Sequence, residues 1–158
     1  MFFRPYTPAD KEACVAILHS SVPTYTLLKE VAEYAEWLDR ACVPGAEDPC
    51  EYLVGAPAPG APLVCAGGVA YAVTAPVAVL CWGIVRTDQH RRGIGSALLT
   101  TRLDRVRARG GVESVLMKTT DAAVGFFLRH GFVVTGRVKD DYGPGVDRLD
   151  LALHLSAN

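Results

Sequence analysis

The chain has 158 residues, of which 50% are apolar and 21% are charged, and its formal net charge is −1. This length predicts a single domain over residues 1–158 with a substantial hydrophobic core. The composition excludes intrinsic disorder. Because a net charge near zero creates no overall field for nucleic acid or an anionic membrane, we expect neither as a partner.

The cysteines and the hydropathy pattern bear on the cellular compartment. The five cysteines form no Cys-x-x-Cys pair, which favours free thiols in a reducing cytoplasm over a disulfide or metal framework. Residues 61–85 carry no charge, which raises a membrane span as an alternative. Gly67-Gly68, Thr74 and Pro76 interrupt that stretch, so two buried strands joined by a turn are the favoured interpretation.

The first half of the chain predicts two helices among short strands. Thr7 and Pro8 have the residue types of a helix N-cap and a first helical position. The strands are expected over 1–6, 51–55 and 63–74, and the helices over about 8–19 and 26–41. Gly67-Gly68 lies inside the third strand and predicts a β-bulge there.

The second half begins with a buried strand over 77–86, which is apolar and rich in β-branched residues. An amphipathic helix is expected from about residue 94, with Arg102–Arg109 on a solvated face, and Gly110-Gly111 ends it. The remaining segments predict a strand over 113–119, a helix over 121–130, a strand over 132–138, a polar loop over 140–147 and a strand over 148–155.

The junction between the strand at 77–86 and the following helix has the residue types of an anion site. The first N–H groups of a helix have no partner inside the helix, and the helix dipole places positive charge there. Gly93 and Gly95 allow close approach to the backbone, and Arg91 and Arg92 add positive charge. A phosphate or diphosphate is the expected ligand.

Two common phosphate motifs do not fit this junction. A P-loop would end in Gly-Lys-Ser/Thr, which the chain lacks. A dinucleotide fingerprint would have a third glycine at the position of Leu98. An unrelated nucleotide-phosphate-binding enzyme is therefore the least favoured hypothesis.

Two segments resemble motifs of the GNAT superfamily of acyl-CoA-dependent N-acetyltransferases. His90-Arg91-Arg92-Gly93-Ile94-Gly95 is similar to the pyrophosphate loop Gln/Arg-x-x-Gly-x-Gly/Ala, with histidine at the first position. The segment 123–132 resembles the family's Ala-x-x-Phe-Tyr-x-x-x-Gly-Phe helix-to-strand motif. The predicted order β-α-α-β-β-β-α-β-α-β-β also suits this fold. The resemblance implies an α/β (α+β) architecture, with a mixed, mostly antiparallel sheet of about seven strands and helices on both faces.

The resemblance also implies acetyl-CoA as co-substrate, with no metal, and a primary amine of a small molecule or peptide as acceptor. In the family, the central strand and the strand after the long helix splay apart, and the pantetheine arm pairs with the central strand just after a bulge. That bulge is expected near Gly83. The resemblance thereby assigns cofactor binding to Ile84, Val85, Arg86, Arg91, Arg92, Gly93, Ile94, Gly95, Ser96, Thr120 and Phe127.

The chain departs from the family pattern at its proton-transfer positions. The tyrosine that often protonates the leaving thiolate falls on Phe127, and a common asparagine falls on Thr120. Tyr142, expected in the loop before the last strand, is the substitute general acid, with water as the alternative. His19, at the end of the first helix, is the candidate base.

The acceptor side of the site has no interpretable motif. Tyr25, Tyr34 and Trp37 are candidates for lining an acceptor pocket, although aromatic residues on a helix face are usually core. Since Phe127 removes the usual acid, the alternative function is an acyl-CoA-binding sensor or regulatory module with little turnover. Family members frequently form dimers, so a homodimer is the remaining partner to consider.

Overall fold

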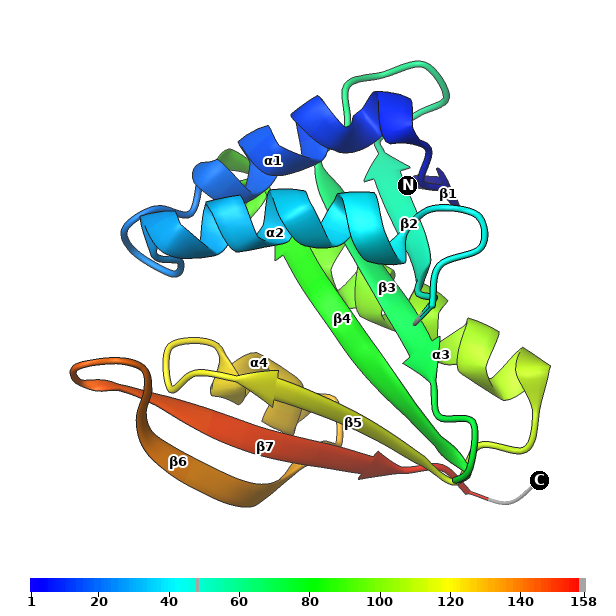
Figure 1. Cartoon of the computed structure of the whole chain (residues 1–158), viewed down its shortest axis with the longest axis vertical. Coiled ribbons are helices and arrows are strands. Elements are labelled where there is room, and N and C mark those ends of the chain that lie inside the picture. The colour runs from blue at the N-terminus through cyan, green and yellow to red at the C-terminus, as the bar shows by residue number, and fades with distance from the viewer. Residues whose placement is uncertain (48, 157–158) are drawn as a thin grey trace. The chain divides into compact units, whose positions relative to one another are not determined.

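The computed structural model describes residues 1–47 and 49–156, and its elements follow the predicted order (Figure 1). Short 3₁₀ turns lie at Pro8–Asp10 and Thr87–Gln89. The helices and strands are β1 (Phe2–Pro5), α1 (Lys11–His19), α2 (Leu28–Ala41), β2 (Glu51–Ala56), β3 (Cys65–Tyr71), β4 (Val77–Val85), α3 (Ile94–Arg109), β5 (Ser114–Thr119), α4 (Val124–Arg129), β6 (Val133–Gly143) and β7 (Val146–His154).

The strands described form one seven-stranded sheet in the order β1-β2-β3-β4-β5-β7-β6. The pair β4–β5 is parallel and joins Val77–Val79 to Ser114–Leu116. The pairs β1–β2, β2–β3, β5–β7 and β6–β7 are antiparallel. The predicted mixed, mostly antiparallel sheet is therefore confirmed.

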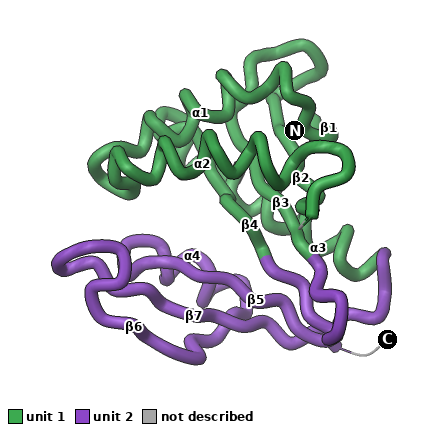
Figure 2. The backbone as a smooth tube through the Cα atoms, in the orientation of Figure 1, with its two compact units in different colours: residues 1–70, 80–108 green, residues 71–79, 109–158 purple. Residues whose placement is uncertain are grey.

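The chain divides into two compact units (Figure 2). Unit 1 contains Met1–Ala70 and Leu80–Ala108, and unit 2 contains Tyr71–Val79 and Arg109–Asn158. Strand β4 contributes to both units, because Val77–Val79 belong to unit 2 and the rest of the strand to unit 1.

Unit 1 has helices on both faces of its strands (Figure 1). One core cluster joins α1 and α2 to the sheet through residues that include Cys14, Leu38, Tyr52 and Ile84. A second cluster joins Val64 and Cys65 to Ile94 and Leu98 of α3. This two-sided core follows from the strands, whose side chains alternate between faces.

Arg102 contradicts the prediction of a solvated basic face on α3, because it is only 4% exposed. It lies where two strands have glycine. A Cβ atom on Gly67 would be 3.1 Å from the Arg102 Cζ, and one on Gly83 would be 2.8 Å from its Nη2. Burial lowers the pKa of Arg102 to about 10, and its Nε has no hydrogen-bond partner among the described residues.

The β2–β3 pairing has no bulge at Gly67-Gly68, since its register runs unbroken from Glu51↔Val69 to Gly55↔Cys65. The absence of a side chain at these two glycines leaves space for neighbouring groups. A Cβ atom on Gly68 would be 2.6 Å from both the Cys50 Sγ and the Tyr52 Cδ2. The two glycines thus make room for side chains from neighbouring segments.

Unit 2 contains a longer hairpin than the sequence predicts. The expected loop over 140–147 is largely strand, because β6 continues to Gly143 and β7 begins at Val146. Aspartates of this polar segment form ion pairs with arginines of the two strands. Arg137 binds Asp121 and Asp147 at 2.9 and 2.8 Å, and Arg148 binds Asp141 and Asp150 at 3.0 Å.

Helices α2 and α4 begin later than predicted, α2 because the residue before it is extended and α4 because a turn precedes it. Leu27 is extended, with φ −88° and ψ 149°, and its N–H donates to the Glu30 carboxylate at 2.6 Å. Before α4, the Thr120 carbonyl accepts the N–H groups of Ala123 and Val124 at 3.1 and 3.0 Å.

The uncharged stretch 61–85 forms β3 and β4, as the sequence predicts. None of the helices within 1–47 and 49–156 has the length and hydropathy needed to cross a membrane. All five cysteines are free thiols.

Asp10 joins β1 to the start of α1. Its carboxylate accepts two hydrogen bonds from Arg4, at 2.8 and 2.7 Å, and a third from the Thr7 N–H at 2.8 Å. The Arg4 guanidinium, with smaller help from Thr7, lowers the pKa of Asp10 below its ordinary value of 3.8. The ionised carboxylate is therefore favoured in the folded state.

We expect Asp10→Asn to lower the free energy of unfolding at neutral pH by about 2 kcal/mol, since it removes hydrogen bonds to a charged group. Because the folded pKa is depressed, this stabilisation is present above about 3.8 and is lost as the pH falls through the folded pKa. Denaturant unfolding of both proteins along a pH series measures the difference. A difference that stays constant at acidic pH would contradict this assignment.

We expect Arg102→Met to raise the free energy of unfolding by about 1 to 3 kcal/mol, because it replaces a buried cation, whose Nε has no hydrogen-bond partner among the described residues, by an apolar chain of similar length. Urea unfolding is the measurement. Arg105→Met, on an exposed position of the same helix, is the matched control and should change stability little. Destabilisation by Arg102→Met would contradict this prediction, because it would mean that the buried guanidinium stabilises the folded state.

Candidate functional site

The predicted anion site is a turn between β4 and α3 with unused backbone donors. Within the described residues, the N–H groups of residues 91–96 find no hydrogen-bond acceptor, and the first paired N–H is that of Ala97, which donates to Gly93 O at 3.0 Å. The start of any helix leaves such groups unpaired. Here they extend back into the loop, which gives six consecutive donors.

The backbone shape and charge of this turn suit an anion. Arg91 and Gly93 have φ values of 61° and 78°, and turns with left-handed residues form concave sites lined by N–H groups. A Cβ atom at Gly93 would meet nothing within 4 Å. Arg91 and Arg92 are both exposed beside the turn. The turn is thus open, with positive charge and free donors.

Hydrogen bonds and a ring contact to residues outside the motif hold the turn in place. His90 uses Nε2 to donate to the Val85 carbonyl at 3.0 Å, so the first position of the motif ties the loop back to β4. Thr87 exchanges hydrogen bonds with Ser20, whose Oγ accepts the Thr87 N–H at 3.0 Å and whose carbonyl accepts the Thr87 hydroxyl at 2.6 Å. The Tyr25 ring lies 5.5 Å from the His90 ring. The α1–α2 turn therefore supports the anion loop.

Strand β4 is irregular at Trp82, one residue before the predicted Gly83. Trp82 has φ 37°, a conformation that costs a non-glycine residue about 1 to 3 kcal/mol. The Trp82 ring lies 5.0 Å from that of Tyr34, and the neighbouring Cys81 thiol forms a hydrogen bond with the Cys50 thiol. The Trp82 ring thus faces α2, whereas Gly83 faces Arg102.

The end of β4 determines which backbone groups stay available. The Arg86 N–H donates to Val64 O at 2.8 Å, so it points toward β3, and the Arg86 side chain binds Asp88 at 2.6 Å. Because alternate residues of a strand direct their backbone groups to opposite edges, Val85 points to the other edge. Among Ile84, Val85 and Arg86, Val85 is thus the residue whose N–H is directed away from β3.

The predicted catalytic residues lie on different units. His19, in unit 1, is exposed at the end of α1, and its imidazole makes no polar contact within the described residues. Tyr142, in unit 2, lies near the end of β6 and not in a loop. Thr120 and Phe127 also belong to unit 2, where the Phe127 ring lies 4.9 Å from that of Phe126 and 5.8 Å from that of Phe132.

Two tyrosine hydroxyls at β4 form an arrangement that the sequence pattern does not signal. The Tyr52 hydroxyl donates to the Trp82 carbonyl at 2.8 Å, and it lies 2.7 Å from the Tyr34 hydroxyl. Tyr34 is 0% exposed, so it is a core residue. Trp37 is half-buried and its ring packs edge-on against Tyr52 at 5.2 Å.

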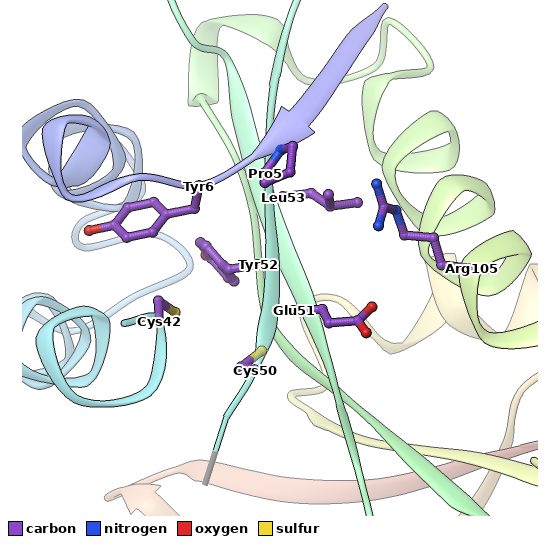
Figure 3. A pocket seen from close by; sticks show the side chains of 8 residues that line it. All are labelled: Pro5, Tyr6, Cys42, Cys50, Glu51, Tyr52, Leu53 and Arg105. Carbon is purple, nitrogen blue, oxygen red and sulfur yellow. The ribbon is translucent and has the colours of Figure 1, made fainter. Parts of the chain in front are cut away.

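A cavity of about 220 Å³ lies at the start of β2 within unit 1. Figure 3 shows Tyr6, Tyr52 and Cys42 on the side of α1 and α2, and Leu53 and Arg105 on the side of α3. None of the predicted cofactor residues lines this cavity. It does place the Tyr52 ring clearly on the α1–α2 face of the sheet.

The turn between β4 and α3 has the free donors and the positive charge of an anion site, on a mixed sheet with helices on both faces of unit 1. The sequence profile of the acetyltransferase (GNAT) family matches residues 14–132, and the chain belongs to this family. It is therefore an acyltransferase of the GNAT type. No curated protein matches the sequence.

Solved structures agree with this assignment at the level of the fold. A candidate GNAT acetyltransferase from Desulfovibrio desulfuricans has a TM-score of 0.81 and 20% identity, over 98% of this chain and 99% of the other. The ribosomal-protein-S18-alanine N-acetyltransferase of Escherichia coli has a TM-score of 0.74 and 18% identity, over 99% and 95%. An aminoglycoside 6′-N-acetyltransferase complexed with coenzyme A has a TM-score of 0.75 and 14% identity, over 100% of this chain and 99% of the other.

Proposed function

We propose that the enzyme transfers an acetyl group from acetyl-CoA to a primary amine of a small molecule or peptide. The observation that carries this proposal is the row of unpaired N–H groups at residues 91–96 beside Arg91 and Arg92. A diphosphate carries negative charge and acceptor oxygens, which complement the positive charge and the unpaired N–H donors of this turn. The family and the coenzyme A complex of one structural neighbour support the same ligand.

The residues present suit acetyl-CoA, because orphaned donors and an open glycine lie where a diphosphate would bind. In this proposal the amides of Arg91 to Ser96 hold the diphosphate, and β4 orients the arm through Val85. Acetyl-CoA, when bound, supplies the acetyl group as a thioester. A β4 N–H directed at the thioester carbonyl would stabilise negative charge on that oxygen. No metal is needed for this chemistry.

The amine acceptor must lose a proton and the leaving thiolate must gain one. An alkyl amine is mostly protonated at neutral pH, so its activation requires a base or a water chain. His19 is the proposed base and Tyr142 the proposed acid, with water as the alternative for either. Thr120 and Phe127 remain proposed contacts to the acyl donor, and Phe127 supplies no proton.

The second candidate function is an acyl-CoA-binding sensor with little turnover. Phe127 favours it, because a phenyl ring occupies the position of the usual tyrosine acid and is packed between two other rings. Both functions require acyl-CoA binding, and they differ in amine-dependent turnover. The free thiols support a reducing, cytoplasmic setting for either.

Calorimetry with coenzyme A tests the binding step, and Gly95→Asp is the diagnostic variant. An aspartate in the first turn of α3 suits the helix dipole, so the variant should fold, yet its carboxylate would repel a diphosphate. We expect affinity to fall at least about tenfold, by analogy with a lost charge-assisted contact. Gly60→Asp, in an exposed loop of the same unit, should bind normally. Unchanged binding by Gly95→Asp would exclude this turn as the site.

Thiol release from acetyl-CoA in the presence of amines, amino acids and peptides distinguishes the two functions. The acetyltransferase predicts release that depends on one class of amine, with equal amounts of thiol and acetylated amine formed. The sensor predicts binding of acetyl-CoA without release above the background for any amine. This screen also identifies the acceptor.

A further inference from the structure

Two buried tyrosines join β4 to the helical layer through a directed hydrogen-bond chain. The Tyr52 hydroxyl donates to the Trp82 carbonyl at 2.8 Å. A hydroxyl has one hydrogen, so the 2.7 Å contact between Tyr52 and Tyr34 must use the Tyr34 hydroxyl as donor. The chain therefore runs from Tyr34 on α2, through Tyr52 on β2, to the backbone of β4.

The carbonyl at the end of this chain belongs to the strained residue of the strand. Trp82 has φ 37°, which is sparsely populated for a residue with a side chain and persists only when its surroundings fix it. Gly68, directly opposite Tyr52 on β3, leaves the space that the Tyr52 ring occupies, because its Cβ would be 2.6 Å from the Tyr52 Cδ2. The Tyr52 hydroxyl can thus reach across β3 to β4.

Both hydroxyls remain protonated donors at working pH. Tyr34 and Tyr52 are 0% and 4% exposed. Burial raises the pKa of each phenol well above its ordinary value. Two aromatic neighbours hold the Tyr52 ring, since Trp37 lies 5.2 Å and Tyr6 5.8 Å from it between centroids. Geometry and protonation therefore both favour a fixed donor.

We propose that Tyr52, oriented by Tyr34, is a positioning residue for acyl transfer, which fixes the Trp82 backbone and thereby the direction of the N–H groups that follow it on β4. This inference rests on the proposed function, because those N–H groups are the proposed contacts to the thioester arm. Tyr52 acts through the backbone and does not touch the acyl group. The diphosphate turn at residues 91–96 is held by other contacts, from Ser20 and His90.

This division of roles predicts which part of the ligand each variant affects. Tyr52→Phe keeps the ring and removes the hydrogen bond to Trp82, so the β4 N–H groups lose their fixed direction. Coenzyme A has the same diphosphate and arm but no acetyl carbonyl, so its affinity should fall less than that of acetyl-CoA. Acetyl-CoA should lose any additional affinity that its acetyl carbonyl gains from β4, a loss of about threefold to tenfold for one hydrogen bond.

Calorimetry with coenzyme A and acetyl-CoA on each full-length protein tests the inference. We expect wild type to bind acetyl-CoA more tightly than coenzyme A, and Tyr52→Phe to bind the two equally. Tyr34→Phe should reduce the preference in the same direction. Tyr6→Phe is the matched control, because its ring contacts Tyr52 while its hydroxyl makes no hydrogen bond within the described residues, and it should keep the wild-type preference.

With an amine from the acceptor screen, Tyr52→Phe should lower kcat at least about tenfold, the size of one lost transition-state hydrogen bond, with KM for acetyl-CoA raised much less. Thermal unfolding separates this from general destabilisation. If Tyr52→Phe retains the wild-type preference and kcat, this inference is wrong although the proposed function stands. If wild type binds neither ligand, the proposed function itself fails.

Discussion

The constraint on which the site depends is that backbone N–H groups must find acceptors. Most of them do so inside helices and sheets, yet the six at residues 91–96 have none within the described chain. Such a turn is stable only if other contacts hold it open. Thr87 bonds to Ser20, 67 residues away in sequence, and His90 bonds to the last residue of β4. The turn therefore keeps unpaired donors in a fixed arrangement, ready for an anion.

Strand β4 carries a second constraint just before this turn. A left-handed Trp82 lies on the α1–α2 face, while Gly83 leaves the other face to the buried Arg102. The hydrogen bonds of Tyr34 and Tyr52 hold the Trp82 carbonyl on one face of the strand. On the other face, the absence of a Cβ atom at Gly83 accommodates the Arg102 guanidinium. The irregular part of β4 is thus supported from both faces within unit 1. This is where the family's acyl donor is expected to lie.

The departure at Phe127 limits what membership of the family says about turnover. The family and the neighbours' folds place the chain among acetyltransferases. At identities of 14–20% the neighbours do not transfer their acceptors to this chain. The α1–α2 turn, where Tyr25 packs against His90, has no motif that identifies an acceptor. Acceptor choice is therefore a property of this chain that only an amine screen can establish.

The sequence by itself predicted the order of elements and the glycine-arginine turn, because periodicity, glycines and helix signals are local, and the mixed sheet followed from the resemblance to the family. It placed Gly83 near the irregularity of β4 but missed Trp82, whose carbonyl accepts a hydrogen bond from Tyr52, 30 residues earlier. It assigned Arg102 to solvent, although glycines on two strands create its buried position. It also took 140–147 as a loop, because pairing of Arg137 and Arg148 with aspartates is not visible in composition. Tertiary structure decided these points, since each depends on residues that only folding brings together.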